Sequence, residues 1–268
     1  MNLTVASDSI HRHPFTFSTL VIAAVVAIET LLKVTSDLLS VELSVITVGI
    51  INGAVLSLLG ALVIQRLGSW RQLGLIGRPV RPQTLLWFLP FAIYGVLPLT
   101  QGLDITAGKA AAAVAFGVLI ASWKLMVLAL VLYAWLPRGP RTSAALTAFF
   151  WASMHVGGIL TGGIVAPTLV LCLSYLFLVF ASVAVRLRTG LLWPIVASYA
   201  LLLASAVAVQ DTEASNLVAS VADVMPALAI SLLLAGYGLV AWPRRAQAAA
   251  HPGARRDRRN HLTEFYAR

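Results

Sequence analysis

Three ionisable side chains lie inside long apolar stretches of the sequence: Glu29 in AIETLLK, Lys124 in LIASWKLMVL and His155 in AFFWASMHVGG. An ionised group inside a membrane-spanning helix costs about 3 kcal/mol unless it is paired or hydrated, so such residues are candidates for function. The ammonium of Lys124 needs a carboxylate, a carbonyl cluster, water or an anionic ligand to replace its lost hydration. Glu29 is the carboxylate at hand, although we expect it at a different depth, and Lys33 one turn on can also pair with it. The Glu29–Lys124 pair is therefore a hypothesis.

The composition identifies the helices that must position these side chains. The chain is 59% hydrophobic and 11% charged, with a mean hydropathy of +0.89, which is typical of a membrane protein. A span needs about 20 apolar residues. The sequence therefore predicts an all-α, polytopic helical bundle of about eight transmembrane helices, near 15–34, 43–65, 84–101, 110–136, 143–160, 164–185, 191–209 and 224–242.

The arginines provide an independent test of these spans, because positive residues accumulate in cytoplasmic loops. With eight spans, all arginine clusters fall on one side of the membrane, whereas Asp104, Asp211, Glu213 and Asp223 fall on the other. This pattern predicts both termini in the cytoplasm. High alanine and arginine usage further indicates a bacterial protein, so we expect a multi-pass protein of the bacterial cytoplasmic membrane.

The domain organisation follows from the same pattern. Residues 1–242 are predicted to form a single transmembrane domain, and residues 243–268 a basic cytoplasmic tail that we expect to be disordered. Such a tail can also attract anionic lipid headgroups. The predicted partner is thus the lipid bilayer. No nucleic acid is expected, because the positive residues lie on the predicted cytoplasmic side of the spans and lack interleaved aromatic residues on which bases could stack.

Three stretches together resemble a known family. They are WRQLGLIGRP at 70–79, the element from Trp151 to His155, and RTGLLWPIVASYA at 188–200. In this order, over about residues 65–210, they resemble the CPBP family of intramembrane endopeptidases, which contains the CAAX prenyl proteases and bacteriocin-processing proteins. The resemblance implies a fold in which a glutamate pair activates water, and two histidines with a polar partner stabilise the transition state.

The sequence departs from this family pattern at most catalytic positions. Ser122 and Trp123 stand where the resemblance implies the glutamate pair, Val127 replaces an arginine, Tyr199 replaces the second histidine, and Leu203 replaces its polar partner. No acidic residue occurs between Asp104 and Asp211. His155 is retained, with Trp151 in place of a phenylalanine. We therefore expect no protease activity of the glutamic kind. The positive charge of Lys124, beside the altered positions, favours an anionic ligand instead.

Other catalytic pairs and a metal site receive little support from the sequence. A Ser122–Lys124 dyad is disfavoured because residues two apart on a helix point away from each other, and a Cys172–His155 pair requires two helices to meet there. Cys172 is expected to be a small buried residue. We predict no metal site, since His155 has no second ligand nearby, and no cofactor.

The leading hypothesis is a non-catalytic CPBP-like membrane protein. It would act as an accessory of another membrane protease or sorting enzyme, or hold a lipid-modified protein substrate. One alternative is an active endopeptidase that uses His155 with a non-standard base such as Glu29. A second alternative is a small-molecule transporter or lipid-binding protein, which requires a hydrated path past Lys124.

Overall fold

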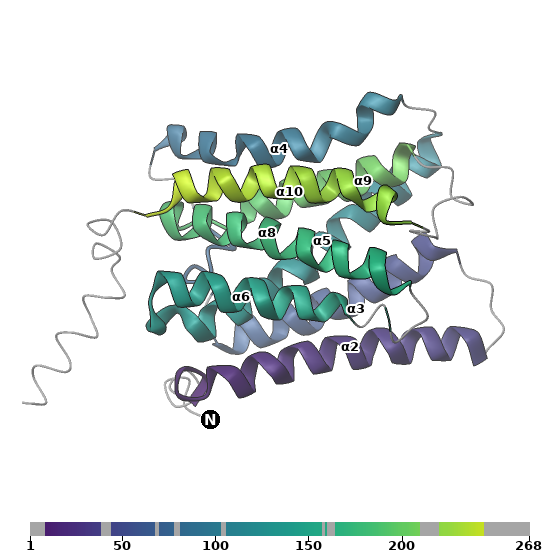
Figure 1. Cartoon of the computed structure of the whole chain (residues 1–268). Helices are drawn as coiled ribbons and strands as arrows, with labels where there is room; N and C mark the ends of the chain where they lie inside the picture. The colour runs from purple at the N-terminus through teal and green to yellow at the C-terminus, as the bar shows by residue number, and fades with distance from the viewer. Residues whose placement is uncertain are drawn as a thin grey trace, which may run out of the picture.

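The protein is an α-helical bundle (Figure 1). The computed structural model describes residues 9–38, 44–67, 70–77, 81–102, 106–156, 159, 164–209 and 220–243, and no strand occurs among them. The helices are α2 (Pro14–Leu38), α3 (Val45–Leu67), α4 (Leu89–Val96), α5 (Ala107–Trp135), α6 (Pro140–His155), α8 (Val165–Thr189), α9 (Trp193–Val209) and α10 (Val221–Ala241). Short 3₁₀ segments, η1 (Pro82–Phe88) and η2 (Leu97–Gln101), flank α4, and η3 (Leu136–Arg138) joins α5 to α6.

A helix lies at each of the eight predicted ranges, and the apolar helices identify a multi-pass membrane protein. Six segments in the described chain are long and apolar enough to cross a bilayer; they begin at Pro14, Ile46, Pro82, Ala107, Val165 and Val221. Helix α9 is apolar but has 17 residues, and α6 has 16. The count of eight crossings and the cytoplasmic termini therefore stay predictions. The tail from residue 244 onward and the pair Gly157–Gly158 lie outside the described residues.

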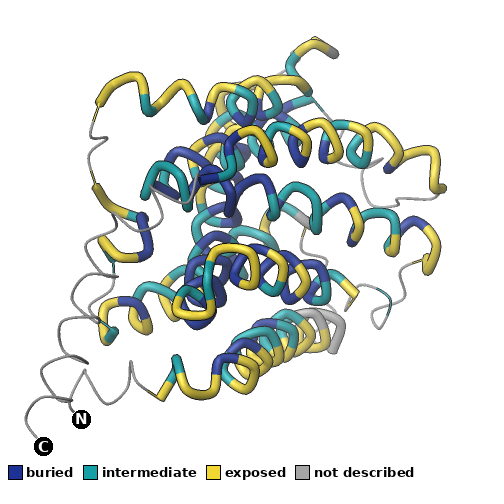
Figure 2. Tube along the Cα trace, turned by 60° about the vertical axis from the view of Figure 1, so that its left-hand side comes forward, coloured by how far each residue is buried: buried dark blue, intermediate teal, exposed yellow. Residues whose placement is uncertain are grey.

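The core of the bundle is centred on α5. Every residue from Val127 to Trp135 is buried, and burial decreases outward from this helix (Figure 2). Glycines allow the neighbouring helices to approach α5 closely. Gly53 and Gly60 on α3 face Leu119 and Met126 of α5, while Gly117 of α5 faces the backbone of α9. Close contact through small residues is how helices in membranes gain packing energy. This packing places α3, α5 and α9 in fixed register.

The short segment 70–77 is bound to the start of α9 and the end of α8. The carbonyl of Gly74 accepts hydrogen bonds from the backbone nitrogens of Leu192 and Trp193, at 2.7 and 3.1 Å. Gly74 has φ +75°, and a side chain there would meet the Gly190 carbonyl oxygen at 2.5 Å, so glycine is required on both counts. Arg186 is 5% exposed and donates to the carbonyls of Gln72 and Leu73.

The contact of Arg186 with segment 70–77 corrects the predicted end of the sixth span. The sixth span was predicted to end at residue 185, with Arg186 in the loop that follows. Helix α8 instead continues to Thr189 and buries Arg186. A buried guanidinium is stable here because backbone carbonyls satisfy its N–H groups in place of water.

Candidate functional site

Lys124 lies near the middle of α5 and is surrounded by aromatic rings. Its Nζ is 5.6 Å from the ring centroid of Tyr175 on α8, 5.9 Å from that of Tyr199 on α9, and 5.7 Å from that of Trp123. The negative faces of aromatic rings attract a cation at such distances. Within the described part of the chain Lys124 forms no hydrogen bond and no ion pair. The ammonium is thus held by rings and remains available to a hydrogen-bond acceptor.

Glu29 lies level with Lys124 across the α2–α5 contact. On these antiparallel helices, Trp135 Nε1 donates to Ser18 Oγ at 3.0 Å. Glu29 is eleven residues beyond Ser18, and Lys124 eleven residues before Trp135, so the same rise along each helix brings the two to one level. The expectation of different depths is therefore wrong. The two side chains interact through their charges but do not approach within the 4.0 Å of an ion pair. The side chain of Lys33, the other partner considered, lies outside the described residues.

His155 ends α6, and its ring is fixed in orientation. Its Nδ1 is 3.1 Å from the carbonyl oxygen of Trp151, one turn earlier. Because a carbonyl can only accept, the neutral ring carries its proton on Nδ1, which leaves Nε2 as an acceptor. The ring also stacks on Tyr175, with centroids 3.9 Å apart and planes 24° apart. Nε2 is buried and has no hydrogen-bond partner in the described chain.

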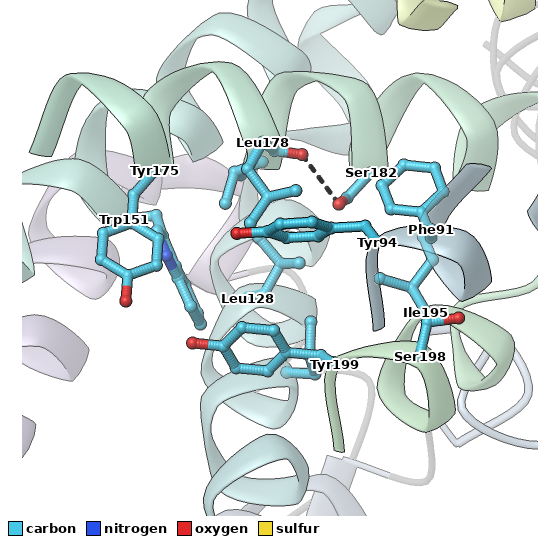
Figure 3. A pocket seen from close by; sticks show the side chains of 12 residues that line it. Phe91, Tyr94, Leu128, Trp151, Tyr175, Leu178, Ser182, Ile195, Ser198 and Tyr199 are labelled. Carbon is cyan, nitrogen blue, oxygen red and sulfur yellow. Dashed lines mark hydrogen bonds between the residues drawn. The ribbon is translucent and has the colours of Figure 1, made fainter. Parts of the chain in front are cut away.

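Further unpaired polar atoms belong to residues that contact Lys124 or His155. The indole nitrogens of Trp123 and Trp151 and the hydroxyl of Tyr199 are also buried without a hydrogen bond to any described residue. The Tyr199 side chain interacts with Tyr175 (Figure 3), but the contact lacks hydrogen-bond geometry. Buried polar groups without partners are uncommon in folded proteins. Two N–H donors, a hydroxyl and an imidazole acceptor therefore give this region an unused hydrogen-bonding capacity.

A small cavity adjoins the cluster. It holds about 30 Å³ and is lined by side chains from α4, α5, α6, α8 and α9. Tyr94, Trp151, Tyr175 and Tyr199 surround it, together with aliphatic residues (Figure 3). A volume of this size holds one or two water molecules and no substrate side chain. The cavity thus adjoins the cluster at Trp151, Tyr175 and Tyr199, whereas Lys124 and His155 are not among its lining residues.

The structure brings together part of the predicted set. Trp123, Lys124, Trp151, His155 and Tyr199 meet through the contacts above. Val127 is 6% exposed in the hydrophobic core, and Leu203 packs against that core. Ser122 is half-buried on α5 and makes no hydrogen bond with Lys124, so the dyad receives no support.

Tyr175 contacts both His155 and Lys124 and was not predicted from the sequence. The one available signal was a phenolic hydroxyl in the middle of a predicted span. Cys172 is a free, buried thiol as expected, and His155 Nε2 has no partner, so a Cys172–His155 pair is not formed. Among the described residues, no group of three potential metal ligands is present.

Comparison with known proteins found no matching family model, no matching curated protein and no matching solved structure. The functional argument therefore rests on the chemistry and geometry of the chain itself.

Proposed function

We propose that this protein is a non-catalytic, CPBP-like integral membrane protein that binds a partner group at the Lys124 cluster. It serves as an accessory in membrane protein processing or sorting, where it holds a lipid-modified protein or assists another membrane protease. Its membrane is the bacterial cytoplasmic membrane, and both termini are cytoplasmic. One observation carries the proposal: the position beside the expected catalytic carboxylates holds the ammonium of the half-buried Lys124, within 5.9 Å of the centroids of three aromatic rings.

The chemistry of the cluster favours binding over hydrolysis. Hydrolysis needs a carboxylate that accepts a proton from water, together with donors for the developing oxyanion. Donors are abundant in the cluster, namely the ammonium and the indole N–H groups of Trp123 and Trp151. Ser122 and Trp123 occupy the positions at which the resemblance implies the base. A cation with several donors and no described carboxylate within ion-pair distance suits a carboxylate, a phosphate or a carbonyl of a bound partner.

A specific observation favours a second candidate, an endopeptidase with Glu29 as base. The α2–α5 register brings Glu29 level with Lys124, and Lys124 and His155 both contact the ring of Tyr175. Among the described carboxylates, Glu29 is the one that helix register brings to the level of the cluster. Transport receives less support, because the cavity beside Tyr175 and Tyr199 holds about 30 Å³ and Lys124 is not among its lining residues.

A map of protein termini in native membranes separates these functions. The strains compared are wild type, a deletion, His155→Ala and Glu29→Gln, with His13→Ala as the matched control because His13 is exposed outside the cluster. A non-catalytic accessory predicts that processing of some membrane protein is lost in the deletion and kept in all three point variants. Loss in both His155→Ala and Glu29→Gln, with normal protein levels, identifies a protease. If the deletion strain shows the same protein termini as wild type, the protein has no role in proteolysis.

A further inference from the structure

A groove lies far from the Lys124 cluster, at the end of the bundle where α8 and α10 finish. Its volume is about 290 Å³, and it is lined by Arg81, Gln83, Thr84, Trp87, Arg188 and Thr189. These residues come from η1 and its N-cap and from the last turn of α8. Liquid water occupies about 30 Å³ per molecule, so the groove has room for a group much larger than one water. Its lining offers two guanidinium groups, one amide and two hydroxyls.

Arg188 is held in place by its neighbours. Its guanidinium carbon lies 3.9 Å from the ring centroid of Trp87, which is a stacked cation–π arrangement. Nη1 approaches the Ala241 carbonyl at 3.5 Å, at the end of α10. Trp87 is itself fixed, since Tyr237 donates from its hydroxyl to the Trp87 carbonyl at 3.0 Å. Arginine has five N–H donors, so the rest of this positioned group remains free to bind an acceptor.

No carboxylate neutralises the groove within the described chain. The sequence has no acidic residue between Glu42 and Asp104, or between Asp104 and Asp211, and these intervals contain all six lining residues. The described carboxylates near the neighbouring helices are Glu29, which lies beside Lys124, and Asp223, at the opposite end of α10. The positive charge of Arg81 and Arg188 is therefore left for an external anion.

The position along the helices matches the level of lipid headgroups. One candidate span begins at Pro82, between the lining residues Arg81 and Gln83, and another ends at the lining residue Thr189. Trp87 and Tyr237 pack together with centroids 5.9 Å apart, as aromatic residues do at the membrane–water boundary. A group entering this groove from the bilayer is thus presented at the depth of a phosphate.

We infer that this groove is a binding site for the phosphate group of an anionic phospholipid. Arg188 binds the phosphate oxygens with the N–H edge that its stacking on Trp87 leaves exposed, and Arg81 contributes the second positive charge. Gln83 and Thr84 supply neutral donors to the headgroup, whereas the Thr189 hydroxyl already donates to the Val185 carbonyl. Guanidinium groups suit phosphate because their planar donors match its oxygens in pairs. The site is independent of the Lys124 cluster and of the function proposed for it.

Native mass spectrometry of the delipidated full chain in a nonionic detergent tests this inference. The probes are phosphatidylglycerol, phosphatidylcholine with the same acyl chains, and glycerol 3-phosphate as a soluble phosphate. The variants are Arg81→Gln and Arg188→Gln, and Arg188→Lys, which keeps the charge but loses the paired donors. Arg138→Gln is the matched control, because Arg138 is an exposed arginine outside the groove.

The site predicts that wild type retains one phosphatidylglycerol more tightly than phosphatidylcholine. Loss of a charge-assisted contact should weaken that binding about tenfold in Arg81→Gln and Arg188→Gln, with a smaller loss in Arg188→Lys and none in Arg138→Gln. The side chain of Arg81 makes no hydrogen bond or ion pair with a described residue, so its variant tests binding even if Arg188→Gln unfolds. Equal retention of the two lipids, or an equal loss in Arg138→Gln, overturns the site. Binding of glycerol 3-phosphate without retention of phosphatidylglycerol overturns the lipid assignment.

Discussion

Replacement of Gly117 by alanine should separate α5 from α9 and thereby disturb the Lys124 cluster. A Cβ at residue 117 would collide with the carbonyl oxygen of Ala200, and would stand 2.9 Å from the Ala204 nitrogen and 3.0 Å from its Cβ. Backbone atoms cannot yield as a flexible side chain can, so one helix must move. Overpacking of this kind costs about 1 to 3 kcal/mol. Because Lys124 lies two turns further along α5, the movement also changes its distance from Tyr199.

The matched control is Gly236→Ala on α10, where a Cβ would meet no heavy atom within 4 Å. That variant gains helix propensity and should be neutral or up to about 1 kcal/mol more stable. Titration of the detergent-solubilised protein with sodium dodecyl sulfate, followed by circular dichroism, gives the free energy of unfolding of both. If Gly117→Ala unfolds at the same point as Gly236→Ala, α5 and α9 do not meet at this distance, and the argument that they assemble the cluster fails.

Two further substitutions test separate contacts by the same titration. Arg186→Gln should lower the free energy of unfolding by about 3 kcal/mol, because it leaves buried carbonyls of segment 70–77 without donors. The control Arg66→Gln, at an exposed arginine, should change it by no more than about 0.5 kcal/mol. Equal effects of the two variants would contradict the buried position of Arg186. Tyr175→Phe keeps the ring that stacks on His155, so it should lower the free energy of unfolding by less than about 1 kcal/mol. Tyr175→Ala removes the ring and should lower it by about 2 kcal/mol or more. Equal losses in the two variants would refute the stacking.

The helical fold could be predicted well from the sequence, because long apolar runs bounded by arginine, proline and glycine leave few alternatives in a membrane. Helices lie at all eight predicted ranges. The end of α8 was less predictable. Arg186 marks a span boundary by composition, and only the carbonyls of a segment more than a hundred residues earlier make its burial possible.

The candidate site was predicted in part. Glu29, Lys124 and His155 were identified as ionisable residues in apolar runs, but their mutual arrangement depends on the register of α2 against α5, which the Ser18–Trp135 contact shows. Hydrophobic patterns fix which residues are helical, yet not the level at which two helices pack. Tyr175 was missed for a related reason, since a tyrosine in a span is unremarkable until its ring is found stacked on His155.

The central claim, a site that binds without cleaving, is tested most directly with purified protein in liposomes and a synthetic peptide whose cysteine carries an S-farnesyl chain. Binding and cleavage are measured in the same sample, by fluorescence of a label on the peptide and by mass spectrometry of the products. The account predicts saturable binding that is weakened in Lys124→Gln, unchanged in the control Lys109→Gln at the far end of α5, and accompanied by no cleaved peptide. A cleavage product that forms with wild type and disappears in His155→Ala would contradict it.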